Sequence, residues 1–395
     1  MDAARALNLL HLGESAGVVY WKPNGLKLYE SLRQFIRRHH LERGYEEVRT
    51  PSLVQLEVFE RSGHLAKYRD YMFAPNQAPD QEWSLQGYAL RPMSCPNHIS
   101  LFSSERRSYR QMPCRLFEFG EVFRNEAAGA LQVLFRQRQF CQDDSHVFAA
   151  KDQVSQEVAR YLAMAQAVYA ELGFASVEVT VSLRPSQRFG DDELWDKAEQ
   201  ALRQACRDAG LDFDEEPGGG AFYGPKIELG VRDHLGRRWQ LGVVQLDYVL
   251  PERFGLEYVA ADDSRHAPVL LHHAVLGSLE RMVGVLLEVH GVELPDFLHP
   301  LPGIVLPVSD KSAAYAAVLH QRLKAAQPLS VAKPVLDESS DKLGAKLRHY
   351  KSLGVPRIWV VGEREAAAFA QDGGYRFNLS ERGKPQPQAG ELVPN

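Results

Sequence analysis

Prolines gather in one short stretch of this chain, and that stretch constrains the fold more than any other feature of the sequence. Pro295, Pro300, Pro302 and Pro307 follow one another closely. Proline lacks a backbone N–H and fixes its own φ, so such a stretch cannot continue a helix or a central strand. We therefore predict a domain boundary here, with one domain at residues 1–298 and a second at residues 299–395. The length of 395 residues fits two or three domains.

The longer first part combines helical and strand periodicities in an irregular order. Apolar residues recur at helical spacing near 26–43, 152–172 and 276–290, whereas residues 176–182 and 227–231 alternate like strands. Long, uneven intervals separate the strands, and the sequence contains no GxGxxG or P-loop motif. The pattern predicts an α+β domain with a mostly antiparallel sheet. An ATP site in it would need an architecture other than a Rossmann fold or a P-loop.

The part after the prolines alternates strand and helix candidates at short intervals. Helical patterns cover about 313–326 and 342–353, and strand candidates lie at Val305, near Val331 and at 358–361. This alternation predicts a small α/β domain.

Bulk composition excludes several classes of protein. The net charge is −5, so a histone-like mode of nucleic-acid binding is excluded, although local patches could still grip RNA. The N-terminus lacks the pattern of a signal peptide, and no run approaches the roughly 18 apolar residues of a membrane helix. Four cysteines without a CxxC pair favour a reduced, cytoplasmic setting.

Chemically useful residues concentrate in three segments, at 91–98, 123–146 and 272–281. Within the second, Arg124 and Arg136 offer permanent guanidinium charge for a polyphosphate, although surface ion pairs would look the same in a single sequence. An aromatic residue in this segment, Phe140, could stack on a purine or could simply be core.

Cys95, His146 and His272 supply one sulfur and two imidazoles, which suit a tetrahedral zinc ion with an open fourth position. They lie far apart in the sequence and form no local zinc motif. From the residues alone, hydrogen-bonded histidines and a buried thiol remain the simpler interpretation.

Several segments resemble those of one enzyme family, in the same order along the chain from about His11 to Leu298. They are Arg91-Pro-Met-Ser-Cys-Pro-Asn-His98, Gln142-Asp-Asp-Ser-His146, Ala221-Phe-Tyr-Gly-Pro-Lys-Ile-Glu228 and Gly242-Val-Val-Gln-Leu-Asp247. On these motifs the chain resembles the threonyl-tRNA synthetases of class II. The resemblance implies a catalytic domain with an antiparallel sheet flanked by helices, followed by a divergent, shortened α/β domain similar to those that bind anticodons.

The resemblance assigns residues to three ligands. It implies that zinc, one ion per subunit, is bound by Cys95, His146 and His272. It implies a threonine site formed by Met93, Gln142, Asp144, Tyr223, Gln245 and Ala274. It implies an ATP site, with Mg²⁺ accompanying the nucleotide, formed by Arg124, Glu126, Arg136, Phe140, Gln240, Ser278 and Arg281.

The implied reaction is attack of the threonine carboxylate on the α-phosphorus of ATP, followed by transfer of the threonyl group to the 3′ end of tRNA(Thr). Arg124, Arg281 and Lys226 would stabilise the phosphates, and His64 would act as the base for the tRNA hydroxyl. Zinc would separate threonine from valine, which a hydrophobic pocket distinguishes by only about 100-fold.

One assignment conflicts with regular strand geometry. Gln240 and Gln245 are an odd number of residues apart, so a regular strand would point them to opposite faces. Either Gly242 marks a bulge, or one of the two assignments is wrong.

The sequence also departs from the family pattern. Full-length bacterial members begin with two further domains, one of which hydrolyses mischarged seryl-tRNA, and we expect no editing site in this chain. Ser339 and Ser340 replace an arginine and its neighbour, and Glu381 lies in a stretch that is basic in relatives. Losing cations there should weaken contacts with an anticodon. His273 replaces an arginine beside a zinc ligand.

Three functions therefore compete. The chain could be a threonine–tRNA ligase without editing, a threonine-activating paralogue that loads a carrier-protein thiol, or an inactive RNA-binding or regulatory paralogue. The presence of all three candidate zinc ligands together with Arg124 and Arg281 argues against an inactive paralogue. Pro51 occupies the position of the motif 1 proline, which implies a homodimer by analogy.

Overall fold

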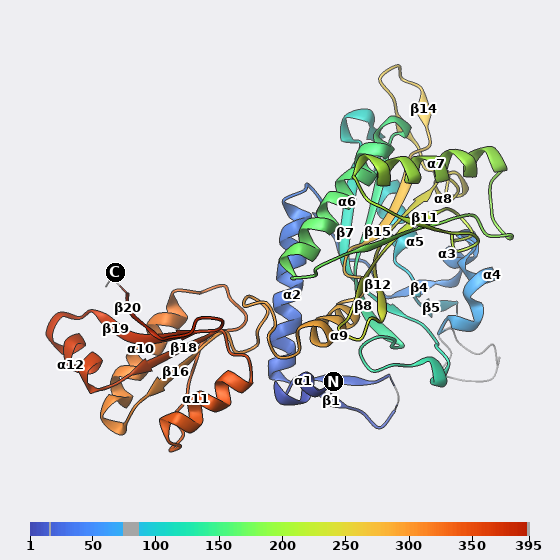
Figure 1. Ribbon diagram of the computed structural model, residues 1–395. Coiled ribbons are helices and arrows are strands. Elements are labelled where there is room, and N and C mark those ends of the chain that lie inside the picture. The colour runs from blue at the N-terminus through green and yellow to red at the C-terminus, as the bar shows by residue number, and fades with distance from the viewer. Residues whose placement is uncertain (16, 74–86, 393–395) are drawn as a thin grey trace. The chain divides into compact units, whose positions relative to one another are not determined.

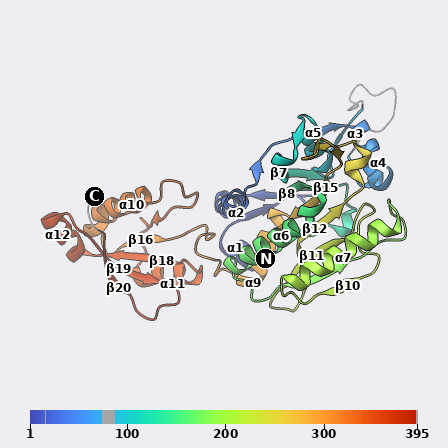
Figure 2. The same ribbon diagram turned by 90° about the horizontal axis from the view of Figure 1, so that it is seen from above.

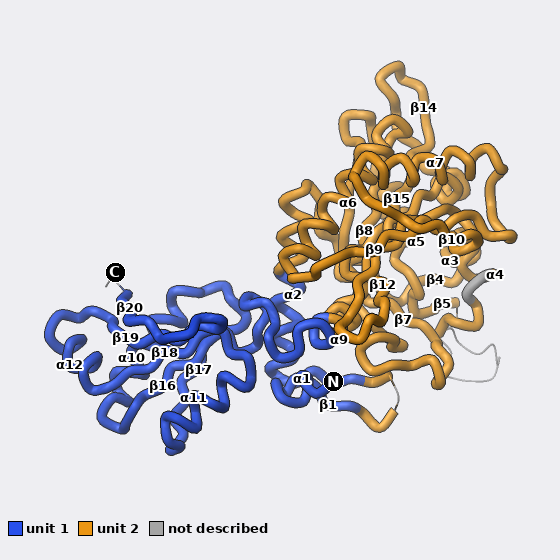
Figure 3. Tube along the Cα trace, viewed as in Figure 1, with its two compact units in different colours: residues 1–12, 19–34, 286–395 blue, residues 13–18, 35–285 orange. Residues whose placement is uncertain are grey.

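The computed structural model describes residues 1–15, 17–73 and 87–392 of the chain (Figure 1). They form two compact units (Figure 3). One comprises residues 13–18 and 35–285, and the other comprises residues 1–12, 19–34 and 286–395. The predicted domain limits at 298 and 299 do not coincide with these units and stay a prediction. Among the described residues, no helix is long and apolar enough to cross a membrane.

An eight-stranded sheet organises the unit of residues 35–285. Its strands are β3 (Glu46–Glu47), β7 (Cys114–Phe123), β8 (Gln139–Ala149), β9 (Glu178–Ser182), β10 (Asp214–Glu216), β11 (Lys226–Arg232), β12 (Arg238–Asp247) and β15 (Val269–Ala274). Their spatial order is β10-β9-β11-β12-β15-β8-β7-β3. The sheet is antiparallel from β9 to β7, and each edge strand runs parallel to its neighbour. The predicted α+β fold is confirmed.

Helices pack on both faces of this sheet. On one face, α6 (Val154–Glu171) and α7 (Asp192–Asp208) lie side by side, as two views show (Figures 1 and 2). On the other face lies α5 (Cys95–Ser103), whose Phe102 stacks on Phe148 of β8 with ring centroids 4.2 Å apart. Burying these rings between helix and sheet fixes α5, which begins at the candidate zinc ligand Cys95.

Shorter elements surround the sheet of this unit. They are α3 (Leu56–Arg61), α4 (His64–Tyr68), α8 (Leu250–Arg253), the pair β4 (Leu53–Gln55) and β5 (Tyr88–Leu90), and the small sheet of β6 (Arg107–Ser108), β13 (Tyr258–Val259) and β14 (Arg265–His266). Two longer helices, α2 (Pro23–Leu41) and α9 (Leu279–His290), match the predicted helical patterns.

Local sequence explains the limits of these elements well. The apolar stripe that predicted a helix at 152–172 is the buried face of α6, and the chain leaves the helix at Gly173, whose φ of +79° suits glycine. Strand predictions at 176–182 and 227–231 correspond to β9 and β11.

A bulge interrupts the pairing of β11 with β12. Glu228 pairs with Val243 and Gly230 with Gln240, so two residues of β12, Leu241 and Gly242, face one residue of β11. A Cβ on Gly242 would lie only 2.5 Å from the Tyr169 hydroxyl, so the close approach of α6 requires glycine here. The bulge resolves the conflict between Gln240 and Gln245 in favour of the first alternative.

The other unit contains a five-stranded sheet in the order β17-β16-β18-β19-β20. Its elements are α1 (Asp2–Ala6), β1 (Leu10–Leu12), β2 (Val19–Trp21), β16 (Ile304–Pro307), α10 (Ala313–Ala325), β17 (Val335–Leu336), α11 (Leu343–Ser352), β18 (Arg357–Val361), α12 (Glu363–Asp372), β19 (Tyr375–Glu381) and β20 (Gln388–Leu392). The predicted α/β character is confirmed. The strand predicted near Val331 instead forms at Val335–Leu336, beyond Pro334, because proline cannot donate to a sheet ladder.

Candidate active site

A polar cavity of about 520 Å³ opens beside β8, β11 and β12. The predicted residues that line it are Met93, Arg124, Glu126, Arg136, Phe140, Gln142, Tyr223, Lys226, Gln240, Gln245, Ser278 and Arg281. The structure therefore gathers most of the predicted ATP and threonine residues around one space, although they come from segments far apart in the sequence.

Three arginines give this cavity a strong positive charge. Arg281 is held in place by two carbonyls, those of Phe135 at 3.0 Å and Gln240 at 3.2 Å. Burial and the neighbouring charges of Arg124 and Arg136 lower the pKa of Arg281, and an anion bound among the three guanidinium groups would offset their mutual repulsion. This arrangement can bind a polyphosphate.

An aromatic ring and a carboxylate line the same cavity and contact two of these arginines. The Arg124 guanidinium lies over the Phe140 ring, 5.1 Å from its centroid. Glu126, which is buried, accepts a hydrogen bond from Arg136 at 2.9 Å. The roles predicted for Phe140 and Glu126 stay predictions.

Strand β8 holds the turn that carries Ser278 and Arg281. Asp143 accepts hydrogen bonds from the backbone N–H groups of Val275 and Leu276, at 2.8 and 3.0 Å. On the preceding residue of the strand, the Gln142 amide donates to the Gly277 carbonyl at 3.0 Å. The sequence analysis missed Asp143, which lies between two predicted residues and serves the chain rather than a ligand.

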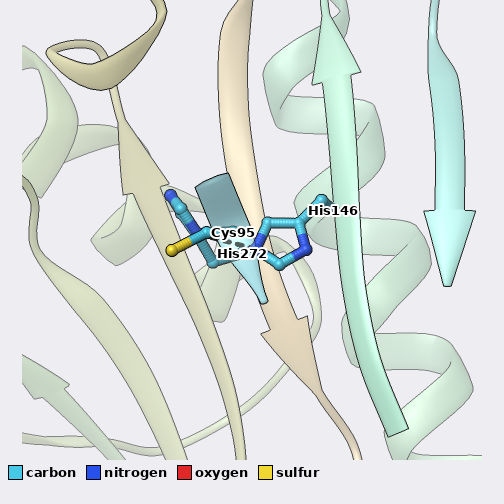
Figure 4. A group of neighbouring side chains, drawn as sticks. All are labelled: Cys95, His146 and His272. Carbon is cyan, nitrogen blue, oxygen red and sulfur yellow. Dashed lines mark hydrogen bonds between the residues drawn. The ribbon is translucent and has the colours of Figure 1, made fainter. Parts of the chain in front are cut away.

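Cys95, His146 and His272 meet in the interior of the unit (Figure 4). His146 of β8 and His272 of β15 are directly paired across neighbouring strands, and Nε2 of the first lies 3.0 Å from Nδ1 of the second. The three candidate ligand atoms lie within 4.8 Å of one another, and all three residues are buried. Three segments with no local motif thus form one cluster.

The chemistry of this cluster fits zinc. Burial, with the histidines around it, lowers the pKa of His146, so the imidazole is neutral and its Nε2 lone pair can bind a metal. Burial, with the Asp144 and Asp247 carboxylates, raises the pKa of the Cys95 thiol, so a thiolate there requires a nearby cation. The second nitrogen of His272 lies 2.9 Å from Asp247, which is the outer contact that metal-bound histidines usually make.

The predicted threonine residues divide between the cavity and the cluster. Tyr223 lines the cavity, and its ring centroid lies 5.1 Å from that of His272. Gln245 also lines the cavity and pairs with His272 across β12 and β15. Asp144 lies beside the cluster instead, 3.9 Å from His146, and Ala274 is buried at the end of β15. These positions would put an amino acid between the metal ligands and the phosphate-binding arginines.

Two predicted catalytic residues have unexpected partners. The Lys226 ammonium forms an ion pair with Glu228 at 2.6 Å. His64 is fully buried and does not line the cavity; its Nε2 lies 3.5 Å from the Cys95 sulfur, and its Nδ1 lies 2.7 Å from the Ser62 hydroxyl. Burial, with the charges of His272 and Arg124, lowers the pKa of His64 to about 3. The roles of both residues stay predictions.

Comparison with known proteins agrees with this geometry. Residues 80–290 match the family described as tRNA synthetase class II core domain (G, H, P, S and T), and residues 304–371 match the anticodon binding domain. The chain is 44% identical to a threonine–tRNA ligase of Thiobacillus denitrificans and 45% identical to one of Granulibacter bethesdensis. Each alignment covers 92% of this chain and 56% of the relative, so the chain spans little more than half the length of these relatives.

Solved structures lead to the same family. The crystal structure of the RNA binding domain of threonyl-tRNA synthetase from Cryptosporidium parvum superposes with a TM-score of 0.90 at 35% identity, over 98% of this chain and 94% of that one. A prolyl-tRNA synthetase from Giardia lamblia shares the fold, with a TM-score of 0.72 at 18% identity, over 98% of this chain and 73% of that one. The chain therefore belongs to the class II aminoacyl-tRNA synthetases and, among them, to the threonyl-tRNA synthetase family.

Proposed function

We propose that this chain activates L-threonine with ATP and transfers the threonyl group to the 3′ end of tRNA(Thr). The observation that carries the proposal is the buried cluster of Cys95, His146 and His272 next to a cavity lined by three arginines. The cluster suits an amino acid with a hydroxyl group, and the cavity with its arginines suits a nucleoside triphosphate. Family membership supports the same activity.

Activation joins the threonine carboxylate to the α-phosphorus of ATP and releases pyrophosphate. Arg124 and Arg281 would bind the phosphates as negative charge shifts toward the leaving group, with Mg²⁺ accompanying the nucleotide. Phe140 would stack on adenine. Because the guanidiniums and the ring are held by the fold, most of the rate enhancement would come from positioning and charge stabilisation.

Cys95, His146 and His272 would hold zinc with one coordination side open toward the cavity. A zinc ion held there would supply a Lewis acid for the amino and hydroxyl groups of threonine, and valine, which lacks the hydroxyl, would be rejected. Gln142 and Tyr223, which line the cavity, would contact the amino acid and fix its carboxylate for attack.

The acceptor has a second candidate, the thiol of a carrier protein, and one observation favours it. In the segment where relatives are basic, Arg382 donates to the carbonyls of Leu294 and Gly354 and pairs with Asp296 at 2.6 Å. The neighbouring Lys384 pairs with Glu381. Both cations are therefore paired with acidic groups of the chain itself, Arg382 partly buried and Lys384 at the surface, which leaves them less able to bind an anticodon.

Threonine-dependent exchange of pyrophosphate into ATP tests activation. We expect exchange with threonine, weaker exchange with serine and almost none with valine. Arg281→Ala should lower kcat/KM for exchange by at least about 100-fold, as loss of a charge-stabilising group does in other enzymes. Arg265→Ala is the matched control, because Arg265 is exposed and pairs only with Glu257 among the contacts described. Absence of exchange by zinc-replete protein would refute the proposal.

Charging of total tRNA by the same preparation then identifies the acceptor. A threonyl-tRNA product supports the main proposal, whereas activation without charging supports the carrier-protein thiol. The homodimer expected from Pro51 stays a prediction, which sedimentation equilibrium would check.

A further inference from the structure

We propose that His98 is a positioning residue of the metal site, which holds His146 in the tautomer whose Nε2 is free to bind the metal. The proposal rests on the metal-binding part of the proposed function and adds residues that have no assigned role. His98 is fully buried and lies on α5, one helical turn after the candidate ligand Cys95.

The two ring nitrogens of His146 have different neighbours. Its Nε2 points into the cluster, 3.0 Å from Nδ1 of His272. Its Nδ1 points away from the cluster and lies 2.9 Å from Nδ1 of His98. A metal on Nε2 needs the lone pair there, so the proton of the neutral ring must sit on Nδ1 and be donated to His98.

That donation fixes the proton of His98 in turn. If Nδ1 of His98 accepts, its proton lies on Nε2, which is 3.3 Å from Oε1 of Glu118. The two other arrangements fail. Protons on both facing Nδ1 atoms would repel each other, and a proton donated from Nδ1 of His98 to Nδ1 of His146 would leave the His146 proton on Nε2, where it blocks the metal. One tautomer of each ring therefore leaves Nε2 of His146 free and turns the His98 N–H toward Glu118, with which it makes an electrostatic contact rather than a hydrogen bond.

Glu118 is the fixed end of this series of contacts. Its carboxylate pairs with Arg91 at 2.7 Å and accepts hydrogen bonds from the Thr50 backbone N–H at 3.0 Å and the Thr50 hydroxyl at 2.8 Å. Arg91 is also tied to the Glu121 carbonyl at 2.8 Å. A buried carboxylate held by an arginine and two further donors is a stable partner for an imidazole N–H.

This arrangement explains why Arg91, Cys95 and His98 lie close together in the sequence. The segment supplies one candidate ligand, Cys95, and its His98 contacts a second, His146 on β8. Outer contacts of this kind commonly contribute 10- to 100-fold to metal affinity. The same effect is expected here from His98, although it never touches the metal.

Two variants separate positioning from simple packing. His98→Gln can accept from His146 with its amide oxygen and donate to Glu118 with its NH₂ group. His98→Leu fills similar space but can do neither. We expect His98→Leu to bind zinc about 10- to 100-fold more weakly, in competition with a chromophoric chelator, and His98→Gln to stay within a few-fold of the unmodified chain. The visible absorption of cobalt(II) in the site should change in the leucine variant and be restored in the glutamine variant.

A measurement on the unmodified, zinc-loaded chain keeps the proposal testable even if His98→Leu does not fold. Long-range ¹H–¹⁵N correlation of ¹⁵N-histidine should find the proton of His98 on Nε2 and that of His146 on Nδ1. The reverse tautomer of His98, or unchanged zinc affinity and cobalt spectrum in folded His98→Leu, would overturn the proposal. These readouts need no threonine or ATP, so a failure of the exchange assay is a separate result.

Discussion

Asp247→Asn is the sharpest single test of the metal site, because it replaces the carboxylate beside His272 by a neutral amide with almost no change in volume. Asp247 is fully buried. Its Oδ2 lies 2.9 Å from Nε2 of His272, and its Oδ1 accepts from the backbone N–H groups of Val249 and Leu250 at 2.8 and 2.9 Å. In the variant the amide oxygen must stay on the two N–H groups, so the NH₂ group turns toward His272.

The expected cost follows from the tautomer that this imposes. An NH₂ group facing Nε2 requires a lone pair there, which moves the histidine proton to Nδ1, the nitrogen that points into the cluster. Loss of an outer-sphere partner costs about 10- to 100-fold in metal affinity, or about 1.4–2.7 kcal/mol. The upper end applies here. The alternative amide orientation would place the NH₂ group against two backbone donors, at a cost of about 1–3 kcal/mol.

Zinc affinity by competition with a chelator measures this effect directly, and selectivity for threonine over valine in the exchange assay should fall with it. Asp233→Asn is the matched control, because Asp233 is also buried and accepts from two backbone N–H groups, those of Leu235 and Arg237. That variant should lose stability but keep zinc. If Asp247→Asn binds zinc within about twofold of the unmodified chain, the tautomer argument is wrong.

Three further outcomes are expected. Gly242→Ala should lower the free energy of unfolding by about 1–3 kcal/mol and raise KM for ATP, because its Cβ would meet the Tyr169 hydroxyl and displace the bulge; urea denaturation and exchange kinetics check both effects. Burial raises the pKa of Asp143 to about 7 despite its backbone donors, so the folded chain binds a proton more tightly than the unfolded chain. The proton on Asp143 therefore stabilises the fold in full below about pH 4, and this contribution, up to about 4 kcal/mol in the free energy of unfolding, is lost as the pH rises to about 7. Asp143→Asn should remove this part of the pH dependence of the free energy of unfolding. Removal of zinc by a chelator should abolish threonine-dependent exchange and lower Tm, and re-addition of zinc should restore both; exchange that survives complete removal would contradict a role for the metal in threonine binding.

Elements with strong periodicity could be predicted from the sequence, and those that depend on partners could not. The stripe of Val154, Val158 and Leu162 predicts α6 because those residues form its buried face. Strand β20, with the sequence Gln388-Ala-Gly-Glu-Leu392, lacks the apolar and polar alternation on which strand prediction rests, whereas β19 carries it at Tyr375, Phe377 and Leu379 and could have been predicted.

The same distinction applies to the site. Residue type and resemblance identify Cys95 and His146 as candidate ligands, but His98 and Asp247 act through atoms that approach only when α5 and β12 pack around β8 and β15. A signal was present, since both lie inside the motifs that carry the resemblance. Its meaning depends on which nitrogen of each imidazole faces inward, and a sequence carries no information on that.

The alternation of β8 has a consequence for how this site can vary. Gln142 lines the cavity and His146 belongs to the Cys95 cluster, whereas Asp143 holds the 275–276 turn and Ser145 lies 3.0 Å from His40 on the opposite face. Successive residues of one strand thus serve the reaction and the scaffold in turn. A single-residue insertion or deletion within β8 would turn every residue on one side of the change to the opposite face, so register, more than the identity of any one side chain, keeps these residues in place.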